Sequence, residues 1–303
     1  MPQKLYGRQH EVEDLLVAFE RACQGTAELV MISGYSGVGK SALVNEIQKP
    51  IAHQGGYFIR GKFDKISRGA PLAPVAHAFR ELIQQILTEP SSELEAWKDR
   101  LLSAVGDNGR LLCDLIPELL LVLGPQPEVI ALGPTEAKNR FGLLVQRFVR
   151  VFAKPEHPLV LFLDDLQWAD AASLQMLRLL LSDPDSKHLA IVGAYRDNEV
   201  DAAHPLMLML DELRKAGTAM TELTLSPLDL PMVNELIADA LRARAADVQP
   251  LAALLFDKTQ GNPFFLGQLL HTLYQEQIIR LEPRSGAFVW DLERASAATA
   301  TDN

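Results

Sequence analysis

Five short apolar stretches recur along the chain, and helical segments separate them. The apolar stretches lie at 28–34, 56–62, 158–165, 188–196 and 220–228. Helical periodicity is found at 11–22, 40–50, 135–154, 170–181 and 204–217, and several mixed helices are expected at 74–123. Apolar strands that alternate with helices predict an α/β fold, with a five-stranded parallel sheet covered by helices on both faces.

The pattern changes after Pro227, where three helical segments follow one another with no apolar strand between them. These segments lie at 231–243, 250–260 and 263–277. The next stretch, "IIRLEPRSGAFVWDL", predicts a hairpin around "RSG" and is similar to the start of a winged-helix module. We therefore expect three parts, which are an α/β domain at 1–227, a helical lid at 228–277 and a partial winged-helix module at 278–303.

Composition narrows the class of protein further. The 303 residues are 48% hydrophobic, and no apolar run reaches the roughly 20 residues that a membrane helix needs. The N-terminus lacks the apolar core of a signal peptide, and Cys23 and Cys113 fall in helical patterns as packing residues. These features predict a cytoplasmic protein. The net charge of −10 argues against a broad nucleic-acid surface, which needs a basic stripe.

The segment after the first apolar stretch has the pattern of a phosphate-binding loop, G-x-x-x-x-G-K-[ST]. It comprises Gly34, Tyr35, Ser36, Gly37, Val38, Gly39, Lys40 and Ser41. Glycines let backbone N–H groups approach phosphates, the lysine carries a charge to the β- and γ-phosphates, and the serine hydroxyl can bind Mg²⁺. The preceding strand and the following helix are the context that this loop requires. We predict that ATP or ADP binds here with Mg²⁺; the alternative is a glycine-rich turn without a ligand.

Two adjacent carboxylates end the third apolar stretch, in "LFLDDLQWAD". In P-loop NTPases the first acid at this position holds Mg²⁺, usually through water, and a second acid can polarise the attacking water. We therefore assign Asp164 to the metal and Asp165 to the water. Neighbouring carboxylates repel each other unless a cation is present, which also favours a metal site. The alternative is an acidic strand end that caps the next turn.

Arg196 ends the fourth apolar stretch, in "GAYRDNEV". In a parallel sheet this end lies on the same side as Asp164 and the phosphate loop, so that the guanidinium could read the γ-phosphate. The alternative is an arginine that pairs with Asp197 or Glu199 in a surface turn.

Two further segments could reach the base or the ribose of a nucleotide. Pro263, in "TQGNPFF", begins a predicted helix, and this segment could fold over the base. Tyr6, Gly7 and Arg8 precede the first helix and could touch the adenine or the ribose. For both segments the alternative is an ordinary helix start.

Other residues near these motifs receive no chemical role from the pattern. Trp168, which follows the acids, is expected to be a packing residue. Lys62 and Arg68 flank a loop after the second apolar stretch that could line the site.

Together these segments resemble the STAND class of signalling ATPases, a branch of the AAA+ ATPases. The resemblance covers nearly the whole chain and rests on "GKFD", "NRF", "EHPLVLFLDDLQWAD", "GAYRDNEV" and "KTQGNPFF" beside the phosphate loop. The chain is similar to the ATPase segment of large bacterial signalling proteins. In those proteins a serine/threonine kinase domain precedes this segment and a sensor histidine kinase follows it.

The resemblance implies a role for each motif. Lys40 and Ser41 would bind phosphate and Mg²⁺, and Asp164 would hold the metal. Asp165 would support hydrolysis, Arg196 would sense the γ-phosphate, and Pro263 would pack on adenine. The resemblance also implies a conformational switch. ADP would hold the protein in a closed state, and ATP together with a stimulus would open it and cause it to oligomerise. Its partners would be the kinase and sensor domains of the larger protein.

We therefore expect an ATP-binding, slowly hydrolysing switch module. The chain ends inside the winged-helix module and contains neither kinase domain, so phosphotransfer to protein is not expected from these residues. Three alternatives stay open: a small-molecule kinase with an acceptor pocket in 74–123, an Orc-like DNA-associated ATPase, and a scaffold that binds nucleotide without hydrolysing it.

Overall fold

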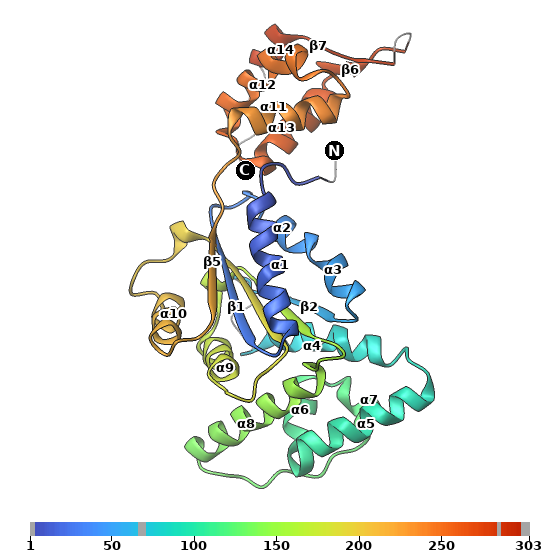
Figure 1. Cartoon of the computed structure of the whole chain (residues 1–303), viewed down its shortest axis with the longest axis vertical. Helices are drawn as coiled ribbons and strands as arrows, with labels where there is room; N and C mark the ends of the chain where they lie inside the picture. The colour runs from blue at the N-terminus through green and yellow to red at the C-terminus, as the bar shows by residue number, and fades with distance from the viewer. Residues whose placement is uncertain (1–3, 66–70, 284–285, 298–303) are drawn as a thin grey trace. The chain divides into compact units, whose positions relative to one another are not determined.

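The computed structural model describes residues 4–65, 71–283 and 286–297, and the chain divides into two compact units (Figure 1). Glu13–Ser33 and Val44–Leu223 form one of them, the sheet unit. Met1–Val12, Gly34–Leu43 and Thr224–Asn303 form the other, the loop unit, which is named for the phosphate loop that it contains. The domain boundaries predicted near 227 and 277 remain predictions.

Five strands form a single parallel sheet, as the sequence predicted, and the structure gives their order as β2-β3-β4-β1-β5. Their bounds are β1 Ala27–Ser33, β2 Tyr57–Lys62, β3 Leu159–Asp164, β4 Leu189–Tyr195 and β5 Met220–Thr224. β4 lies between β3 and β1, and Leu163 and Ser33 are level with Gly193 and Tyr195 of β4. The residues that follow β1, β3 and β4 therefore leave the sheet at one edge.

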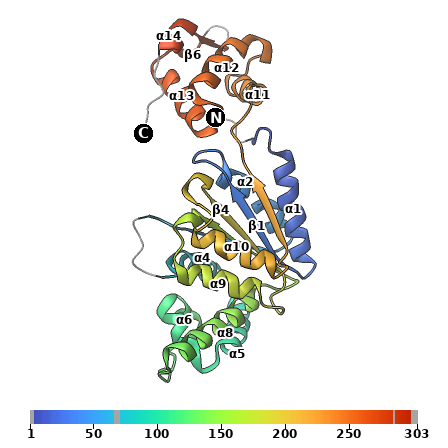
Figure 2. The same ribbon diagram turned by 90° about the vertical axis from the view of Figure 1, so that its left-hand side faces the viewer.

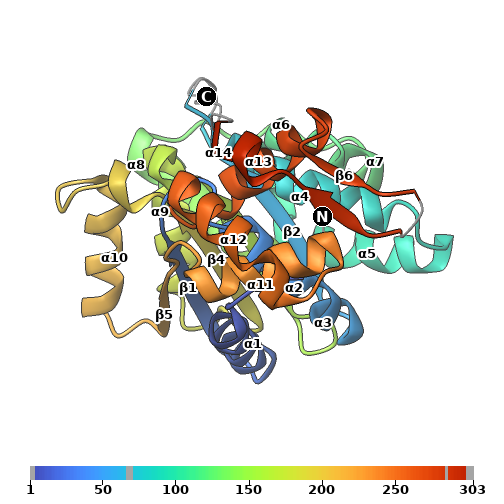
Figure 3. The same ribbon diagram turned by 90° about the horizontal axis from the view of Figure 1, so that it is seen from above.

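Helices cover both faces of the sheet. Figure 3 shows α1 and α3 on one side of it, with α4 and α9 on the other. The bounds of these and the adjoining helices are α1 Gln9–Cys23, α2 Lys40–Glu46, α3 Gln48–His53, α4 Ala73–Ile86, α9 Ala171–Leu181 and α10 Pro205–Lys215. None of the helices among the described residues is long and apolar enough to cross a membrane.

A further group of helices belongs to the sheet unit, and within it α5 packs against α7 and α8. The bounds are α5 Ser91–Val105, α6 Gly109–Leu115, α7 Leu119–Leu123 and α8 Pro134–Phe152, and the short 3-10 turns are η1 Gly106–Asn108, η2 Leu166–Trp168 and η3 Asp197–Glu199. Phe79, Phe148 and Leu161 share one core, and the rings of Phe79 and Phe148 lie 5.1 Å apart. Such aromatic packing supports the strands whose ends carry the acids and Arg196.

The loop unit contains a second core, formed by helices and a hairpin (Figure 2). Its elements are α11 Leu230–Leu241, α12 Ala245–Thr259, α13 Pro263–Gln275, β6 Ile279–Leu281, β7 Phe288–Trp290 and α14 Leu292–Ala297. Val233, Leu251 and Leu266 are fully buried in this core. β6 and β7 pair antiparallel, as the predicted hairpin requires, and the turn residues 284–285 lie outside the described residues.

Three elements differ from the prediction. The helix expected at 250–260 begins earlier, at Ala245, so that Pro250 lies inside α12. The helix expected at 40–50 is divided at Ile47 into α2 and α3, and Pro50 does not end it. Pro50 is the third residue of α3, where the backbone N–H would have no partner inside the helix, so a proline is tolerated. The strand expected at 220–228 ends at Thr224, and Pro227 could not donate a hydrogen bond to a neighbouring strand.

Candidate nucleotide site

The phosphate loop directly follows β1 and contains three glycines with positive φ angles, of which Gly34 has +146°. Gly37 and Gly39 have φ angles of +78° and +106°, which side chains rarely allow. A Cβ at Gly37 would lie 2.8 Å from atoms of Asn262 and Phe264, whereas a Cβ at Gly39 would meet nothing within 4 Å. The loop is thus packed at Gly37 and open at Gly39, which leaves room for phosphate oxygens beside its backbone.

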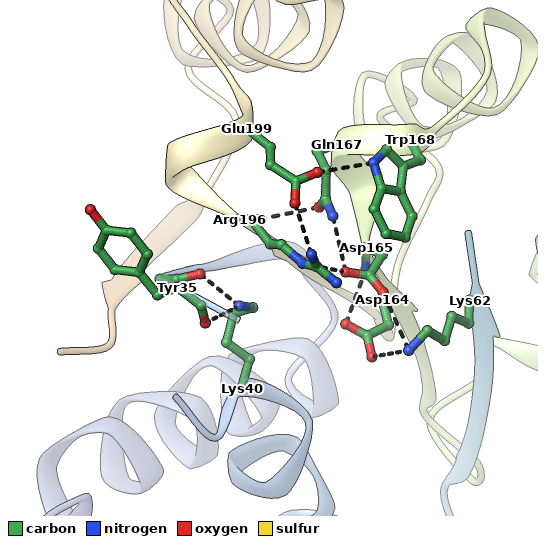
Figure 4. A network of polar contacts seen from close by, with 10 residues as sticks. Tyr35, Lys40, Lys62, Asp164, Asp165, Gln167, Trp168, Arg196 and Glu199 are labelled. Carbon is green, nitrogen blue, oxygen red and sulfur yellow. Dashed lines mark hydrogen bonds and ion pairs between the residues drawn. The ribbon is translucent and has the colours of Figure 1, made fainter. Parts of the chain in front are cut away.

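Lys40 begins α2, and its side chain folds across the loop. Its Nζ donates hydrogen bonds to the carbonyl oxygens of Gly34, at 2.6 Å, and Tyr35, at 2.9 Å (Figure 4). Val38 and Lys40 are buried, and Ser36 and Ser41 are exposed. An open glycine backbone, a held ammonium group and an adjacent hydroxyl are a donor set that fits a nucleoside phosphate with Mg²⁺.

The phosphate loop is hydrogen-bonded to the start of α13, and both belong to the loop unit. Asn262 Nδ2 donates to the Ser36 carbonyl at 2.9 Å, and the Phe264 N–H donates to the Gly37 carbonyl at 3.2 Å. Asn262 Oδ1 also accepts from the Phe264 N–H, at 3.0 Å, so the same side chain caps the helix. Pro263 is the first helical residue, and its predicted contact with adenine stays a prediction.

Gly261 fixes the turn that presents Asn262 to the loop. Its φ is +70°, and an added Cβ would lie 1.9 Å from the backbone oxygen of Leu228. We expect Gly261→Ala to lower the free energy of unfolding of the loop unit by about 2–4 kcal/mol, because left-handed alanine is strained and backbone cannot move aside easily. Urea unfolding followed by circular dichroism, with limited proteolysis of the C-terminal helices, measures this effect.

Gly286→Ala is the matched control for that substitution. Gly286 also belongs to the loop unit and has a φ of +67°, but its Cβ would meet nothing within 4 Å. Gly286→Ala should therefore lower the free energy of unfolding only through the strain of a left-handed alanine, by about 1 kcal/mol. Equal losses for the two variants would contradict the role given to the contact between Gly261 and Leu228.

The acid pair lies at the end of β3 in the sheet unit. Asp164 is the last residue of the strand, and Asp165 turns the chain into η2 with a φ of +57°. Aspartate tolerates this left-handed conformation better than most residues. The Asp165 N–H donates to Asp164 Oδ1 at 3.0 Å, and the two side chains are 14% and 7% exposed. Two poorly hydrated carboxylates are thus held side by side (Figure 4).

Three donors surround the carboxylate of Asp165. Gln167 Nε2 donates to Oδ1 at 3.0 Å, and Arg196 Nε lies 3.4 Å from the same oxygen. Lys62 Nζ lies 3.3 Å from Oδ2 (Figure 4). Gln167 Oε1 also accepts from the N–H of Arg196 at 3.2 Å, so this amide joins the ends of β3 and β4.

Arg196 is oriented by further contacts within the sheet unit. Its Nη1 lies 2.8 Å from Glu199 Oε1, and its guanidinium lies over the Trp168 ring at 4.9 Å. Trp168 Nε1 donates to Glu199 Oε2 at 3.0 Å. The pairing with Glu199 that was considered as an alternative therefore coexists with the contact to Asp165, and Trp168 orients the arginine as well as packing against the core.

The N-terminal segment contacts protein groups of the loop unit. Tyr6 Oη donates to Asp239 Oδ2 at 2.9 Å, and burial together with this hydrogen bond raises the pKa of Tyr6 to about 12. Arg8 is buried and donates to the Ser226 carbonyl, and Gly7 between them has a φ of +63°. The predicted contacts of Tyr6, Gly7 and Arg8 with adenine or ribose stay predictions.

Sequence reasoning missed Gln167 and Asn262, and it named Lys62 only as a residue beside a loop that could line the site. Lys62, Gln167 and Asn262 each contact a predicted site residue through a side chain. A partial signal existed for Lys62, because it ends the second predicted strand as the acid pair ends the third, but the pairing of these two strands is known only from the structure. Arg68, which was considered with Lys62, lies outside the described residues.

The parallel sheet, the phosphate loop after β1 and the acid pair after β3 define a P-loop NTPase-like fold. The family model described as AAA ATPase domain matches residues 4–192, and the chain belongs to this family. It is therefore a nucleotide-binding ATPase module, a class that typically uses Mg²⁺.

Two curated relatives are histidine kinases. Hybrid signal transduction histidine kinase G of Dictyostelium discoideum is 28% identical over 363 residues, which cover 99% of this chain and 10% of that protein. Peroxide stress-activated histidine kinase mak2 of Schizosaccharomyces pombe is 24% identical over 286 residues, which cover 88% of this chain and 12% of that protein. The chain thus spans about a tenth of the length of the curated relatives that it matches.

A solved structure with a similar fold is Cdc6p from Pyrobaculum aerophilum. It matches with a TM-score of 0.53 and 12% sequence identity, over 91% of this chain and 64% of that one. At this identity the likeness concerns the fold alone.

Proposed function

We propose that this chain is a STAND-type switch module that binds ATP with Mg²⁺, hydrolyses it slowly and changes conformation with the nucleotide. The observation that carries this proposal is the shared edge at which β1, β3 and β4 end. The phosphate loop, the acid pair and Arg196 follow these three strands. This edge, at the carboxyl ends of parallel strands, is where open α/β sheets bind their ligands.

Five of the predicted site residues have roles that their charges or oxygen atoms support. Lys40 binds the β- and γ-phosphates, and Ser41 and Asp164 hold Mg²⁺, which neutralises phosphate charge when it is bound. Asp165 polarises the attacking water, and the Arg196 guanidinium binds the γ-phosphate, which is present in ATP and absent from ADP.

The surroundings of Asp165 support slow rather than rapid hydrolysis. Its carboxylate is held by Gln167 and lies beside two cations, Lys62 and Arg196. Both oxygens of this carboxylate are engaged, because Oδ1 accepts from Gln167 and lies beside Arg196, and Oδ2 lies beside Lys62. A water that approaches Asp165 must share an oxygen with one of these partners or displace it, which supports slow hydrolysis.

The hydrogen bonds between the phosphate loop and α13 support the switch. Ser36 and Gly37 accept from the first turn of this helix, and the same loop is the predicted phosphate site. A nucleotide that changes the loop conformation changes these bonds as well. ATP and ADP then differ in their affinity for the two arrangements, which is the requirement for a switch.

The relatives support a place in signal transduction. The chain aligns over 99% and 88% of its length with the two histidine kinases, and it corresponds to a small part of each. We propose that it is the ATPase segment of a larger signalling protein, whose kinase and sensor domains are its partners. Nucleotide-dependent self-association is part of the same proposal.

The test of this proposal is to purify the chain without added nucleotide, denature it and identify the released compounds by chromatography. A closed switch that traps its product is expected to release close to one ADP per chain. An empty protein that turns over added ATP rapidly would contradict the switch and favour an ordinary ATPase or a small-molecule kinase. A protein that binds no nucleotide would contradict the proposal as a whole.

Asn262→Ser is expected to accelerate ADP release by about fivefold to tenfold, the equivalent of one lost hydrogen bond. A serine can still cap α13, whereas its short side chain cannot replace the amide that donates to the Ser36 carbonyl. Stopped-flow displacement of a fluorescent ADP analogue measures the release rate.

The control for the helix cap is Asp229→Ala. Asp229 caps α11 through the Met232 N–H at 2.9 Å and also belongs to the loop unit, so this variant loses a cap without losing the bond between Asn262 and the phosphate loop. Release rates that rise equally in both variants would mean that loosened helices, and not the bond to Ser36, cause the effect.

A further inference from the structure

Lys62 brings a second cationic group, beside Arg196, to the end of the sheet where the acid pair lies. β2 is parallel to β3, and Lys62 is directly opposite Asp164 in the register. Its Nζ lies 3.3 Å from Asp165 Oδ2 and 3.9 Å from Asp164 Oδ2 (Figure 4). One ammonium group therefore faces both carboxylates.

We propose that Lys62 is a displaceable counter-cation of the acid pair. It balances Asp164 and Asp165 in the metal-free protein and moves away from Asp164 when Mg²⁺ binds with nucleotide. The inference rests on the proposed nucleotide site and adds to it a residue that sets how much Mg²⁺ the site requires.

The first argument is the charge of the pair. Asp164 and Asp165 are adjacent, and both side chains are largely withdrawn from water. Two carboxylates in such surroundings repel each other strongly, and a nearby cation relieves that repulsion. Lys62 lies at the Oδ2 atoms of both acids, which is the position from which one charge can serve the two groups.

The second argument is the difference between the two cations at this site. The Arg196 side chain is 26% exposed, and it is also bonded to Glu199 and stacked on Trp168. The Lys62 side chain is 68% exposed, and its distance of 3.3 Å to Asp165 is close to the 3.4 Å of Arg196. Exposure and the further contacts of Arg196, rather than distance to the acids, therefore distinguish the two cations. Exposed ion pairs contribute little to stability and their side chains keep much of their freedom. Lys62 is thus the cation that can leave at small cost.

The consequence is competition for the same oxygens. A divalent ion outcompetes a single exposed ammonium group, but the ammonium group still weakens metal binding while it stays near Asp164. Removal of Lys62 should therefore lower the Mg²⁺ concentration that nucleotide binding requires, and it should leave the metal-free acid pair without one of its counter-cations.

The experiment is a Mg²⁺ titration of fluorescent ADP-analogue binding to the full chain. For Lys62→Gln we expect the half-maximal Mg²⁺ concentration to fall by about threefold to tenfold, and for Lys62→Arg, which keeps the charge, to stay within about twofold of the wild type. Lys65→Gln is the matched control, because Lys65 is an exposed lysine of the same segment.

A second measurement is the melting temperature without nucleotide, in EDTA and in Mg²⁺. In EDTA, the melting temperature of Lys62→Gln should be lower than that of the wild type. Addition of Mg²⁺ should raise the melting temperature of Lys62→Gln more than that of the wild type.

Three outcomes overturn the inference or separate it from the proposed function. An unchanged Mg²⁺ requirement in Lys62→Gln would overturn it. So would weaker ADP-analogue or ATP binding at saturating Mg²⁺, since Lys62 would then be a phosphate ligand. If the wild type binds no nucleotide, the proposed function fails. The melting temperatures then decide the inference alone, and an equal Mg²⁺ gain in Lys62→Gln and the wild type would overturn it.

Discussion

Lys40→Met is expected to weaken ATP binding by about 100-fold or more. The ammonium group of Lys40 is held at the phosphate loop by the carbonyls of Gly34 and Tyr35. The side chain therefore loses little conformational entropy when phosphate binds. A hydrogen bond to a charged group contributes about 1.5–3 kcal/mol, and each 1.4 kcal/mol corresponds to about tenfold in affinity. Methionine keeps the unbranched shape of the lysine side chain up to Cε and removes all of its donors.

Isothermal titration calorimetry with ATP and with ADP, both with Mg²⁺, measures this loss. Lys49→Met is the control, since Lys49 is an exposed lysine in α3 that lies outside the phosphate loop. It should bind both nucleotides within about threefold of the wild type. Circular dichroism of Lys40→Met establishes that the loop unit stays folded. Undiminished binding by a folded Lys40→Met would remove the loop from the nucleotide site.

Features that depend on neighbouring residues in the chain were predictable from the sequence. The strands β1, β3 and β4 are mostly apolar and buried. The phosphate loop is defined by glycines, Lys40 and Ser41 within a single short segment. Asp164 and Asp165 likewise follow a strand whose apolar residues are contiguous. Local pattern therefore gave the sheet and the order of the motifs along it.

Features that depend on distant residues were not predictable in the same way. The bond between Asn262 and Ser36 joins residues 226 positions apart, and no periodicity connects them. The position of Lys62 follows from the register of β2 against β3, which a single sequence does not specify. The effect of Pro50 was also not predictable, although it depends on nearby residues. A proline is tolerated in the first turn of a helix and disrupts a helix interior, and the sequence did not show where α3 begins.

Asp165→Asn is expected to lower ATP turnover by about 100-fold to 1,000-fold, while ATP binding stays within about threefold of the wild type. Asparagine has the shape of aspartate and also tolerates the left-handed backbone at φ +57°, so the turn after β3 should persist. One amide oxygen can still accept from Gln167 and Arg196, but the group can no longer polarise water as an anion.

A phosphate-release assay together with calorimetric ATP binding separates this effect from a loss of affinity. Asp185→Asn is the control for net charge, because Asp185 also belongs to the sheet unit and its side chain is 75% exposed. It should leave turnover within about threefold of the wild type. Lost turnover with retained binding would assign the water to Asp165 and contradict a non-hydrolysing scaffold. Unchanged turnover in Asp165→Asn would remove this role, and the contacts of Asp165 with Lys62, Gln167 and Arg196 would then serve to orient the end of β4.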